Sequence, residues 1–301
     1  MPVLIPLTLA DAVGAMASHP GALALAGGTD FMVEVNEGHR SIPHRSLQQG
    51  DGTVVALSRV PELTSYAIDR QAGTVTLGAA VTWSTIEQEP LRSLLPALAE
   101  AARTVGSPQI RNAGTVGGNL ATCSPAGDGL PVLAALDASV TLVSASGTRT
   151  MPVRQFMVGV KQTALEPGEL ISAVTLPLLD GWQGYSKVGV RNAMVIATAS
   201  ACVAVDQPTQ SVRIALGSVA PTIVRCDLAE AIVAAEADWS SMSLSPDSAQ
   251  RACEAAVAAS RPIDDHRSSA AYRRHAVGVM VTRLLNRAFA SSPTTNTEVD
   301  S

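Results

Sequence analysis

The chain has 301 residues, of which 47% are hydrophobic, and a formal net charge of -5 at pH 7. This composition predicts a globular protein with two or three subdomains, and the acidic balance without a basic stripe argues against a nucleic-acid partner. The first residues lack a basic region and no apolar run approaches the roughly 18 residues of a membrane span, so we expect a cytoplasmic protein with neither a signal peptide nor a transmembrane helix.

A glycine pair stands among the first predicted elements. Residues 23–26 predict a short buried strand, which is followed by a turn at Gly27-Gly28 and by a helix from about Asp30, with Thr29 or Asp30 as its N-cap. Further strands are predicted over residues 54–57 and 74–77.

A second glycine pair, Gly117-Gly118, follows an amphipathic helical pattern that runs from Leu94 to Val105 and ends at Gly106. At both pairs, glycine allows a positive φ and a close approach to a ligand, so we expect consecutive N–H groups to point at phosphate oxygens. Beyond the second pair the pattern predicts a short helix over 130–136 and a strand over 139–143.

Neither glycine segment carries a cationic side chain. No Lys or Arg occurs between Gly21 and Val35 or between Asn112 and Leu136. A bound phosphate would therefore be held by backbone amides and helix N-termini, which suits a pyrophosphate-linked cofactor. Because the dinucleotide fingerprint G-x-G-x-x-G and the P-loop are both absent, we expect a long dinucleotide in a crevice between two small lobes.

A domain boundary is expected near Pro177–Gly184, where proline, aspartate and glycine cluster between apolar runs. Beyond it the sequence predicts strands over 197–205 and 212–216, helices over about 246–260 and 268–289, and a disordered tail from Ser291. The four cysteines are scattered and no histidine lies near a nucleophile motif, so the sequence predicts no metal site and assigns no catalytic residue.

Several segments resemble, in this order, the FAD-binding medium subunit of the molybdenum hydroxylases, the family of xanthine dehydrogenase, carbon monoxide dehydrogenase and bacterial heteroaromatic dehydrogenases. The strongest are Ala26–Asp30, Val105–Ala121 and Ser124–Asp128, and weaker support comes from Tyr185–Arg191, Arg261–Asp265 and Ala271–Arg273. Each segment alone is a modest signal. Their order and spacing over nearly the whole chain make the resemblance specific.

The resemblance implies an α+β fold. Residues 1–177 are expected to form a two-lobed FAD-binding domain of the PCMH or vanillyl-alcohol-oxidase type, with lobes of about 1–53 and 54–177. Residues 178–290 are expected to form a smaller α+β domain like the C-terminal domain of the carbon monoxide dehydrogenase flavoprotein, before a disordered tail over 291–301.

The resemblance also implies which residues hold a non-covalent FAD. Its pyrophosphate is expected on the backbone of 25–31 and 114–118, the flavin side at Asp128, and the isoalloxazine beside Ile171 and Lys187. The full expected set is Leu25, Ala26, Gly27, Gly28, Thr29, Asp30, Phe31, Val105, Gly114, Thr115, Val116, Gly117, Gly118, Asn119, Ser124, Asp128, Ile171 and Lys187.

Four polar residues keep a second interpretation. Asp30 is either a helix N-cap or a contact to the ribityl chain, and Asp128 is either a cap of the following helix or a flavin contact. Lys187 is either a solvated side chain or a cation that stabilises the reduced flavin. Arg111 either pairs with a partner subunit or caps the preceding helix.

The function that the resemblance implies is electron transfer. Electrons from a large molybdopterin subunit would pass through the clusters of a small [2Fe-2S] subunit to FAD here, and then to NAD, a quinone or oxygen, within a heterotrimer or a dimer of heterotrimers. The rival hypotheses are a stand-alone FAD-dependent oxidoreductase acting on a small molecule, and a non-enzymatic module whose flavin site has decayed.

Overall fold

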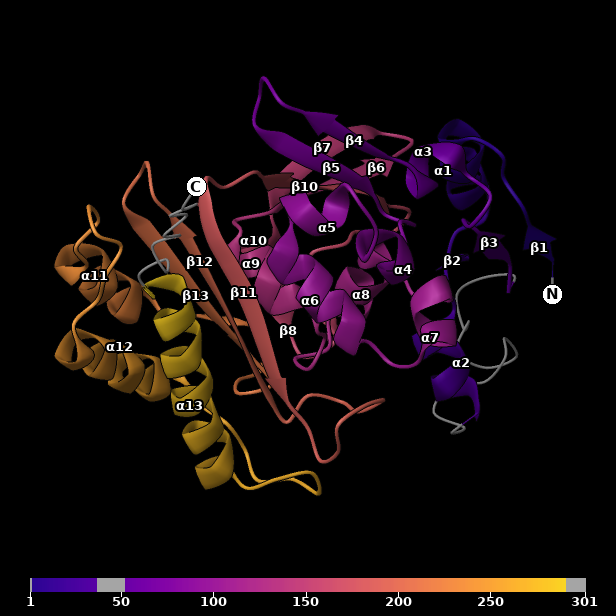
Figure 1. The fold of residues 1–301 in the computed structure, drawn as a ribbon. Helices are drawn as coiled ribbons and strands as arrows, with labels where there is room; N and C mark the ends of the chain where they lie inside the picture. The colour runs from indigo at the N-terminus through magenta and orange to yellow at the C-terminus, as the bar shows by residue number, and fades with distance from the viewer. Residues whose placement is uncertain (1, 37–51, 291–301) are drawn as a thin grey trace, which may run out of the picture.

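The computed structural model describes residues 2–36 and 52–290, which form three packed units (Figure 1). The N-terminal lobe is a parallel sheet in the order β1-β3-β2 with two helices. Its elements are β1 (Val3–Leu4), α1 (Leu9–Ser18), β2 (Leu23–Leu25), α2 (Thr29–Asn36) and β3 (Val54–Ala56). Because β3 pairs with both β1 and β2, the first sheet extends just past the expected lobe division at residue 53.

The middle unit is an antiparallel sheet in the order β4-β5-β10-β6-β7, which packs against short helices. Its strands are β4 (Tyr66–Asp69), β5 (Thr74–Gly78), β6 (Ser139–Ser144), β7 (Gly147–Pro152) and β10 (Leu170–Pro177), with a hairpin of β8 (Met157–Gly159) and β9 (Gln162–Thr163). Its helices are α3 (Pro61–Thr64), α4 (Trp83–Ile86), α5 (Leu91–Leu94), α6 (Pro96–Thr104), α7 (Pro108–Ala113), α8 (Val116–Thr122), α9 (Gly129–Ala135) and α10 (Val153–Phe156). One core continues from α1 of the N-terminal lobe through this unit.

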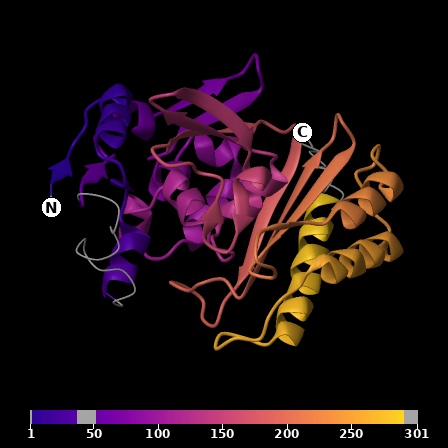
Figure 2. The ribbon, with the colours of Figure 1, turned by 180° about the vertical axis from the view of Figure 1, so that it is seen from behind.

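The C-terminal unit is an antiparallel sheet in the order β11-β12-β13-β14, with helices α11, α12 and α13 on one face (Figures 1 and 2). Its strands are β11 (Gly181–Val188), β12 (Ala199–Asp206), β13 (Ser211–Gly217) and β14 (Val224–Arg225), and its helices are α11 (Asp227–Glu236), α12 (Pro246–Ala259) and α13 (Ala270–Ala288). The other face packs against α6 and α9, so the middle unit lies between the two others.

Strand β12 shows how the sequence fits this position. Its side chains alternate between two cores: Ala201 and Val203 pack among the C-terminal helices, whereas Cys202 and Ala204 pack in the core of the middle unit. A strand covered on both faces must be apolar throughout, since successive side chains point to opposite faces.

Most of the predicted elements are present, but several helices were not expected. The predicted helix over 94–105 is α6, which begins only at Pro96, while Leu94 ends the separate short helix α5. Helices α1, α7, α8 and α11, among others, had no predicted counterpart, and Gly117-Gly118 lies inside α8. The predicted tail over 291–301 lies outside the described residues. Within the described ranges, no helix is both long and apolar enough to cross a membrane.

Candidate functional site

The two glycine segments, far apart in the sequence, lie in direct contact. A Cβ on Gly27 would lie 1.8 Å from the carbonyl oxygen of Ala113, at the end of α7. The hydroxyl of Thr122, at the end of α8, donates to Oδ2 of Asp30 at 2.8 Å. Gly27 is therefore required for the close approach of α2 to α7, and Asp30 links α2 to α8 instead of capping its own helix, which begins at Thr29.

Gly28 provides the feature expected of an anion cradle. Its φ is +69°, a left-handed conformation that favours glycine, and a Cβ there would meet only Leu25, at 3.6 Å. Among the described residues, the backbone N–H groups of Gly28, Thr29 and Asp30 donate no hydrogen bond. Unused donors at the start of a helix, beside a position that a side chain would fill, fit a negatively charged group such as a phosphate.

The second glycine pair behaves differently from the expectation. Gly117 and Gly118 have helical conformations, so the predicted positive φ is wrong for both. The Gly117 amide donates to the carbonyl of Ala79 at 2.8 Å, and a Cβ on Gly117 would lie 2.6 Å from Ala79. The Gly118 amide donates to Oγ1 of Thr115, the N-cap of α8, at 3.0 Å. These donors are already used, so Gly117 and Gly118 supply close packing rather than free amides.

Thr115 and Asn119 leave polar groups open in the second segment. The Thr115 N–H group donates to no acceptor within the described part of the chain. The bridge between Thr82 and Thr115 is instead formed by the residues on either side, since the amides of Trp83 and Val116 donate to the carbonyls of Gly114 and Val81. Oδ1 of Asn119 is buried and has no partner there either. The Asn119 side chain packs against Gly127 and Gly129, where a Cβ would come within about 3 Å of the amide (2.9 and 3.0 Å).

A buried polar cluster connects Asp128, at the start of α9, with β11. Oδ1 of Asp128 accepts from the Tyr185 hydroxyl at 2.9 Å, and Oδ2 accepts from Nζ of Lys187 at 2.8 Å. The same ammonium donates to the carbonyl of Thr104 at 3.0 Å. Asp128 makes no side-chain cap bond to α9, and the Lys187 side chain is only 5% exposed. The alternatives of a helix cap and a solvated lysine are thus both wrong.

Burial governs the protonation of this cluster. It raises the pKa of Asp128, against the attraction of the Lys187 ammonium and the hydrogen bonds that Lys187 and Tyr185 donate. Burial, together with the negative charge of Asp128, holds the pKa of Tyr185 well above its usual value. The phenol therefore remains protonated and acts as a donor to the carboxylate.

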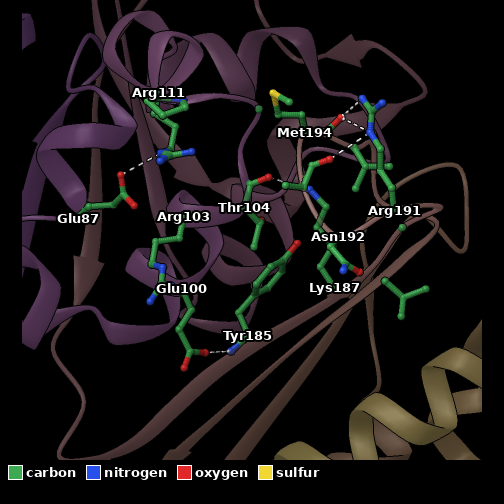
Figure 3. Close-up of a pocket in the computed structure, with 16 residues that line it drawn as sticks. Glu87, Glu100, Arg103, Thr104, Arg111, Tyr185, Lys187, Arg191, Asn192 and Met194 are labelled. Carbon is green, nitrogen blue, oxygen red and sulfur yellow. Dashed lines mark hydrogen bonds and ion pairs between the residues drawn. The ribbon is translucent and has the colours of Figure 1, made fainter.

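Tyr185 and Lys187 of this cluster, together with Thr104, line one wall of a pocket of about 820 Å³ (Figure 3). The pocket is bounded by α6 and α7 on one side and by the end of β11 and the following loop, residues 189–195, on the other. Arg111 donates from Nε to Glu87 at 3.0 Å, so its cation is paired within the chain. It also donates to the carbonyl of Val105 at 3.4 Å, after the end of α6. Arg191 donates to the carbonyls of Ala193 and Met194 and so braces the loop on itself.

Other expected site residues lie outside this pocket. Ile171 is buried in β10 opposite Leu142, in the core of the middle unit. Val105 is the C-cap of α6, next to the pocket residue Thr104. Ser124 shapes the turn that precedes Asp128, because its Oγ accepts from the amide of Ala126 at 3.3 Å.

Tyr185 and Glu100 are site residues that the sequence reasoning did not select. Tyr185 stands two positions before Lys187, and two residues apart on a strand share a face, so this spacing could have revealed it. Glu100 accepts from the Tyr185 amide at 2.6 Å and fixes the edge of β11 against α6. No local pattern marks Glu100, since its partner is 85 residues away.

Comparisons with known proteins give a consistent result over both parts of the chain. Residues 1–179 match the model of the FAD binding domain in molybdopterin dehydrogenase, and residues 185–288 match the carbon monoxide dehydrogenase flavoprotein C-terminal domain. The carbon monoxide dehydrogenase medium chain of Hydrogenophaga pseudoflava is 32% identical over 279 residues, covering 89% of this chain and 93% of that protein. The putative xanthine dehydrogenase FAD-binding subunit of Escherichia coli is 27% identical, covering 95% and 94%.

The solved structures agree with the sequence comparisons. A carbon monoxide dehydrogenase structure from Hydrogenophaga pseudoflava superposes with a TM-score of 0.85 and 29% identity, covering 97% of this chain and 98% of that one. The expected α+β fold, with an FAD-binding domain followed by a smaller C-terminal domain, is confirmed.

Proposed function

The chain belongs to the FAD-binding subunits of the molybdenum hydroxylases, and from this membership we propose that residues 25–31 and 114–118 hold the pyrophosphate of FAD, while Asp128 and Lys187 lie on its flavin side. FAD binding and a role as an electron-transfer subunit of an oxidoreductase follow from the family. The observation that best supports this placement is the contact of the two glycine segments beside the open position and unused N–H groups at Gly28.

At the proposed pyrophosphate site the protein supplies neutral hydrogen-bond donors and no cationic side chain. Within the described part of both segments the donors are backbone amides and hydroxyls, because neither segment contains Lys or Arg. The first turn of α2 supplies the Thr29 and Asp30 amides, and the partial positive charge of the helix N-terminus favours an anion there. The Asp30 carboxylate accepts a hydrogen bond from the Thr122 hydroxyl, which directs it toward the end of α8.

The protein's contribution at the flavin side is a fixed, paired charge. FAD supplies the redox chemistry, since it can take up electrons singly and give them up in pairs. Lys187 is held by Asp128 and by the Thr104 carbonyl, so the ammonium faces the pocket with its rotamer fixed. Because the carboxylate compensates most of its field, Lys187 favours negative charge nearby less strongly than a lone cation would.

We extend the proposal to assembly. The relatives include proteins named as medium subunits, such as the nicotine 6-hydroxylase medium subunit of Paenarthrobacter nicotinovorans, which is 30% identical over 294 residues. The proposed partners are a small [2Fe-2S] subunit and a large molybdopterin subunit, with NAD, a quinone or oxygen as the acceptor. The proposed domain division remains 1–177 and 178–290.

The placement of FAD can be tested with Gly28→Ala. We expect the dissociation constant of FAD to rise more than tenfold, since Ala tolerates the left-handed φ poorly and its methyl would enter the cradle. Gly14→Ala is the control, because Gly14 lies on α1, where an added methyl group would meet no other atom within 4 Å. Equal FAD affinity in both variants would contradict the cradle.

The subunit role is tested by expressing the chain alone. Heat or acid should release the yellow flavin, and dithionite should reduce it, but a heteroaromatic or aldehyde substrate should not. Addition of the two partner subunits should restore reduction by substrate. Rapid substrate-dependent bleaching of the isolated protein would instead favour the stand-alone oxidoreductase.

A further inference from the structure

Arg273, near the start of α13, is a buried arginine whose role the proposed FAD site does not explain. The residue is 4% exposed, whereas its neighbour Arg274 is exposed. Its Nη1 donates to the carbonyls of Thr198 and Ser218, both at 2.8 Å, and its Nη2 donates to Oδ1 of Asp265 at 2.7 Å. Arginine is the side chain that can bridge two carbonyls and a carboxylate at once with one rigid fork.

The two carbonyls lie at the base of the loop over 189–197, between β11 and β12, which we call the pocket loop because its residues 189–195 border the pocket. Thr198 immediately precedes β12, and its amide donates to the carbonyl of Val188, the last residue of β11, at 2.8 Å. The hydroxyl of Ser218 donates to the carbonyl of Ala197 at 2.8 Å. The two ends of the loop are therefore joined by hydrogen bonds of Thr198 and Ser218, and Arg273 binds the carbonyls of both residues.

Ser218 also connects this base to the other side of the site. Its amide donates at 2.8 Å to the carbonyl of Pro125, in the turn that leads to Asp128. Ser218 holds a φ of +63°, which is unfavourable for a side chain other than glycine and persists only where the surroundings impose it. The bond from Arg273 to the Ser218 carbonyl helps to impose it, because that bond fixes the orientation of the peptide.

Asp265 orients the guanidinium. Its Oδ1 also accepts from the amides of Arg267 and Ser268, at 2.9 and 3.1 Å, so the carboxylate is fixed in its own turn before it meets Arg273. Within the described residues, Nε of Arg273 has no acceptor. Burial of an incompletely bonded cation is costly, and an apolar residue would fill the space at lower cost. We therefore explain the buried Arg273 by the positions in which it holds the segments that it contacts, and not by a gain in the free energy of folding.

We propose that Arg273, oriented by Asp265, is a positioning residue for the flavin side of the site: it holds the loop over 189–197 and the turn before Asp128 in one fixed relation. The inference rests on the proposed function. It also assigns a role to the C-terminal segments Arg261–Asp265 and Ala271–Arg273, which lie outside the FAD-binding domain.

The first test needs no cofactor. Arg273→Lys keeps a charge and a trypsin site but loses the fork, and Arg274→Lys is the matched control on the same helix. Under native conditions the flavin-free Arg273→Lys protein should be cut by trypsin after Arg191, in the pocket loop, at least fivefold faster than the wild type. Cleavage at other sites should keep its rate, and the control should match the wild type. An unchanged rate at Arg191, or an equal increase at all sites, would overturn the proposal.

The second test uses the FAD-loaded protein. In Arg273→Lys and Asp265→Asn, quenching of flavin fluorescence by iodide should increase at least twofold and the flavin reduction potential should shift, since a loosened wall admits solvent. A role in stability alone would lower the melting temperature and leave both readings of the bound flavin unchanged, which would also overturn the proposal. If the wild type itself bound no FAD, the proposed function would fail instead, and the proteolysis result would still decide the loop contact.

Discussion

Replacement of Lys187 by Met should leave the Asp128 carboxylate buried without its cation. The wild-type ammonium contacts Oδ2 of Asp128 at 2.8 Å and the Thr104 carbonyl at 3.0 Å, and the two charged side chains are only 5% and 10% exposed. Removing one partner of such a pair typically costs about 3–5 kcal/mol, because the other charge stays buried and unpaired.

Protonation of Asp128 sets an upper limit to this cost. In the unfolded chain the carboxyl has its ordinary pKa of 3.8. Neutralising it at pH 7 therefore costs about 4 kcal/mol, and at pH 5 about 2 kcal/mol, at about 1.4 kcal/mol per pH unit. Burial already raises the pKa of Asp128 in the wild type, and removal of the Lys187 ammonium raises it further, so the variant gains more stability than the wild type as the pH falls through its folded pKa. The loss should thus be about 3–4 kcal/mol at pH 7 and about 2 kcal/mol at pH 5.

The assay is urea denaturation of the flavin-free protein at both pH values. The double variant Asp128→Asn with Lys187→Met should recover about 2 kcal/mol at pH 7, because no buried charge remains. Arg70→Met, at an exposed arginine, should change stability by less than about 0.5 kcal/mol. A loss below about 1 kcal/mol, an equal loss at both pH values, or a double variant no better than the single one would refute this reasoning.

Three further changes probe the fold around the site. Gly27→Ala should lower the free energy of unfolding by about 2 kcal/mol or more in urea melts, because the new methyl meets the Ala113 carbonyl at 1.8 Å; wild-type stability would contradict the contact of α2 with α7. Arg225→Met should lower the free energy of unfolding by about 3–5 kcal/mol in the same assay, because the Glu230 carboxylate, which lies 2.6 Å from Nε of Arg225, would lose its cation. A loss under about 1 kcal/mol would count against that pair. Burial raises the pKa of Cys226 to about 12, so mass spectrometry after maleimide treatment of the native protein at pH 8 should find that thiol unmodified; rapid labelling would show that it is not buried.

Local patterns were sufficient to place several strands, turns and helices along the chain. The strand β2, the glycine turn after it and the helix that follows were predicted because strand, turn and helix signals act over a few residues. The expected burial of that strand is wrong, since Leu23 and Leu25 are half-buried and Ala24 is exposed. Strand β12 was also predicted, but the sequence did not show that its side chains alternate between two cores, because this depends on the helices that cover each face.

The two glycine pairs show the limit of such reasoning. From the sequence they look alike, yet Gly28 has a positive φ whereas Gly117 is helical and packs against Ala79. The same residue type provides a left-handed turn in one case and room for close packing in the other. A local sequence does not reveal which backbone will approach it from 38 positions away.

By itself, the sequence determined the family and the cofactor class, because the motifs and their order can be read along the chain. The tertiary structure alone decided which of these residues meet. Asp128 meets Tyr185 and Lys187 across 57 and 59 residues, and Arg273 meets Thr198 across 75. Charge pairing and hydrogen bonding act over a few ångströms of space, so their partners are fixed by how the three units pack and not by distance along the chain.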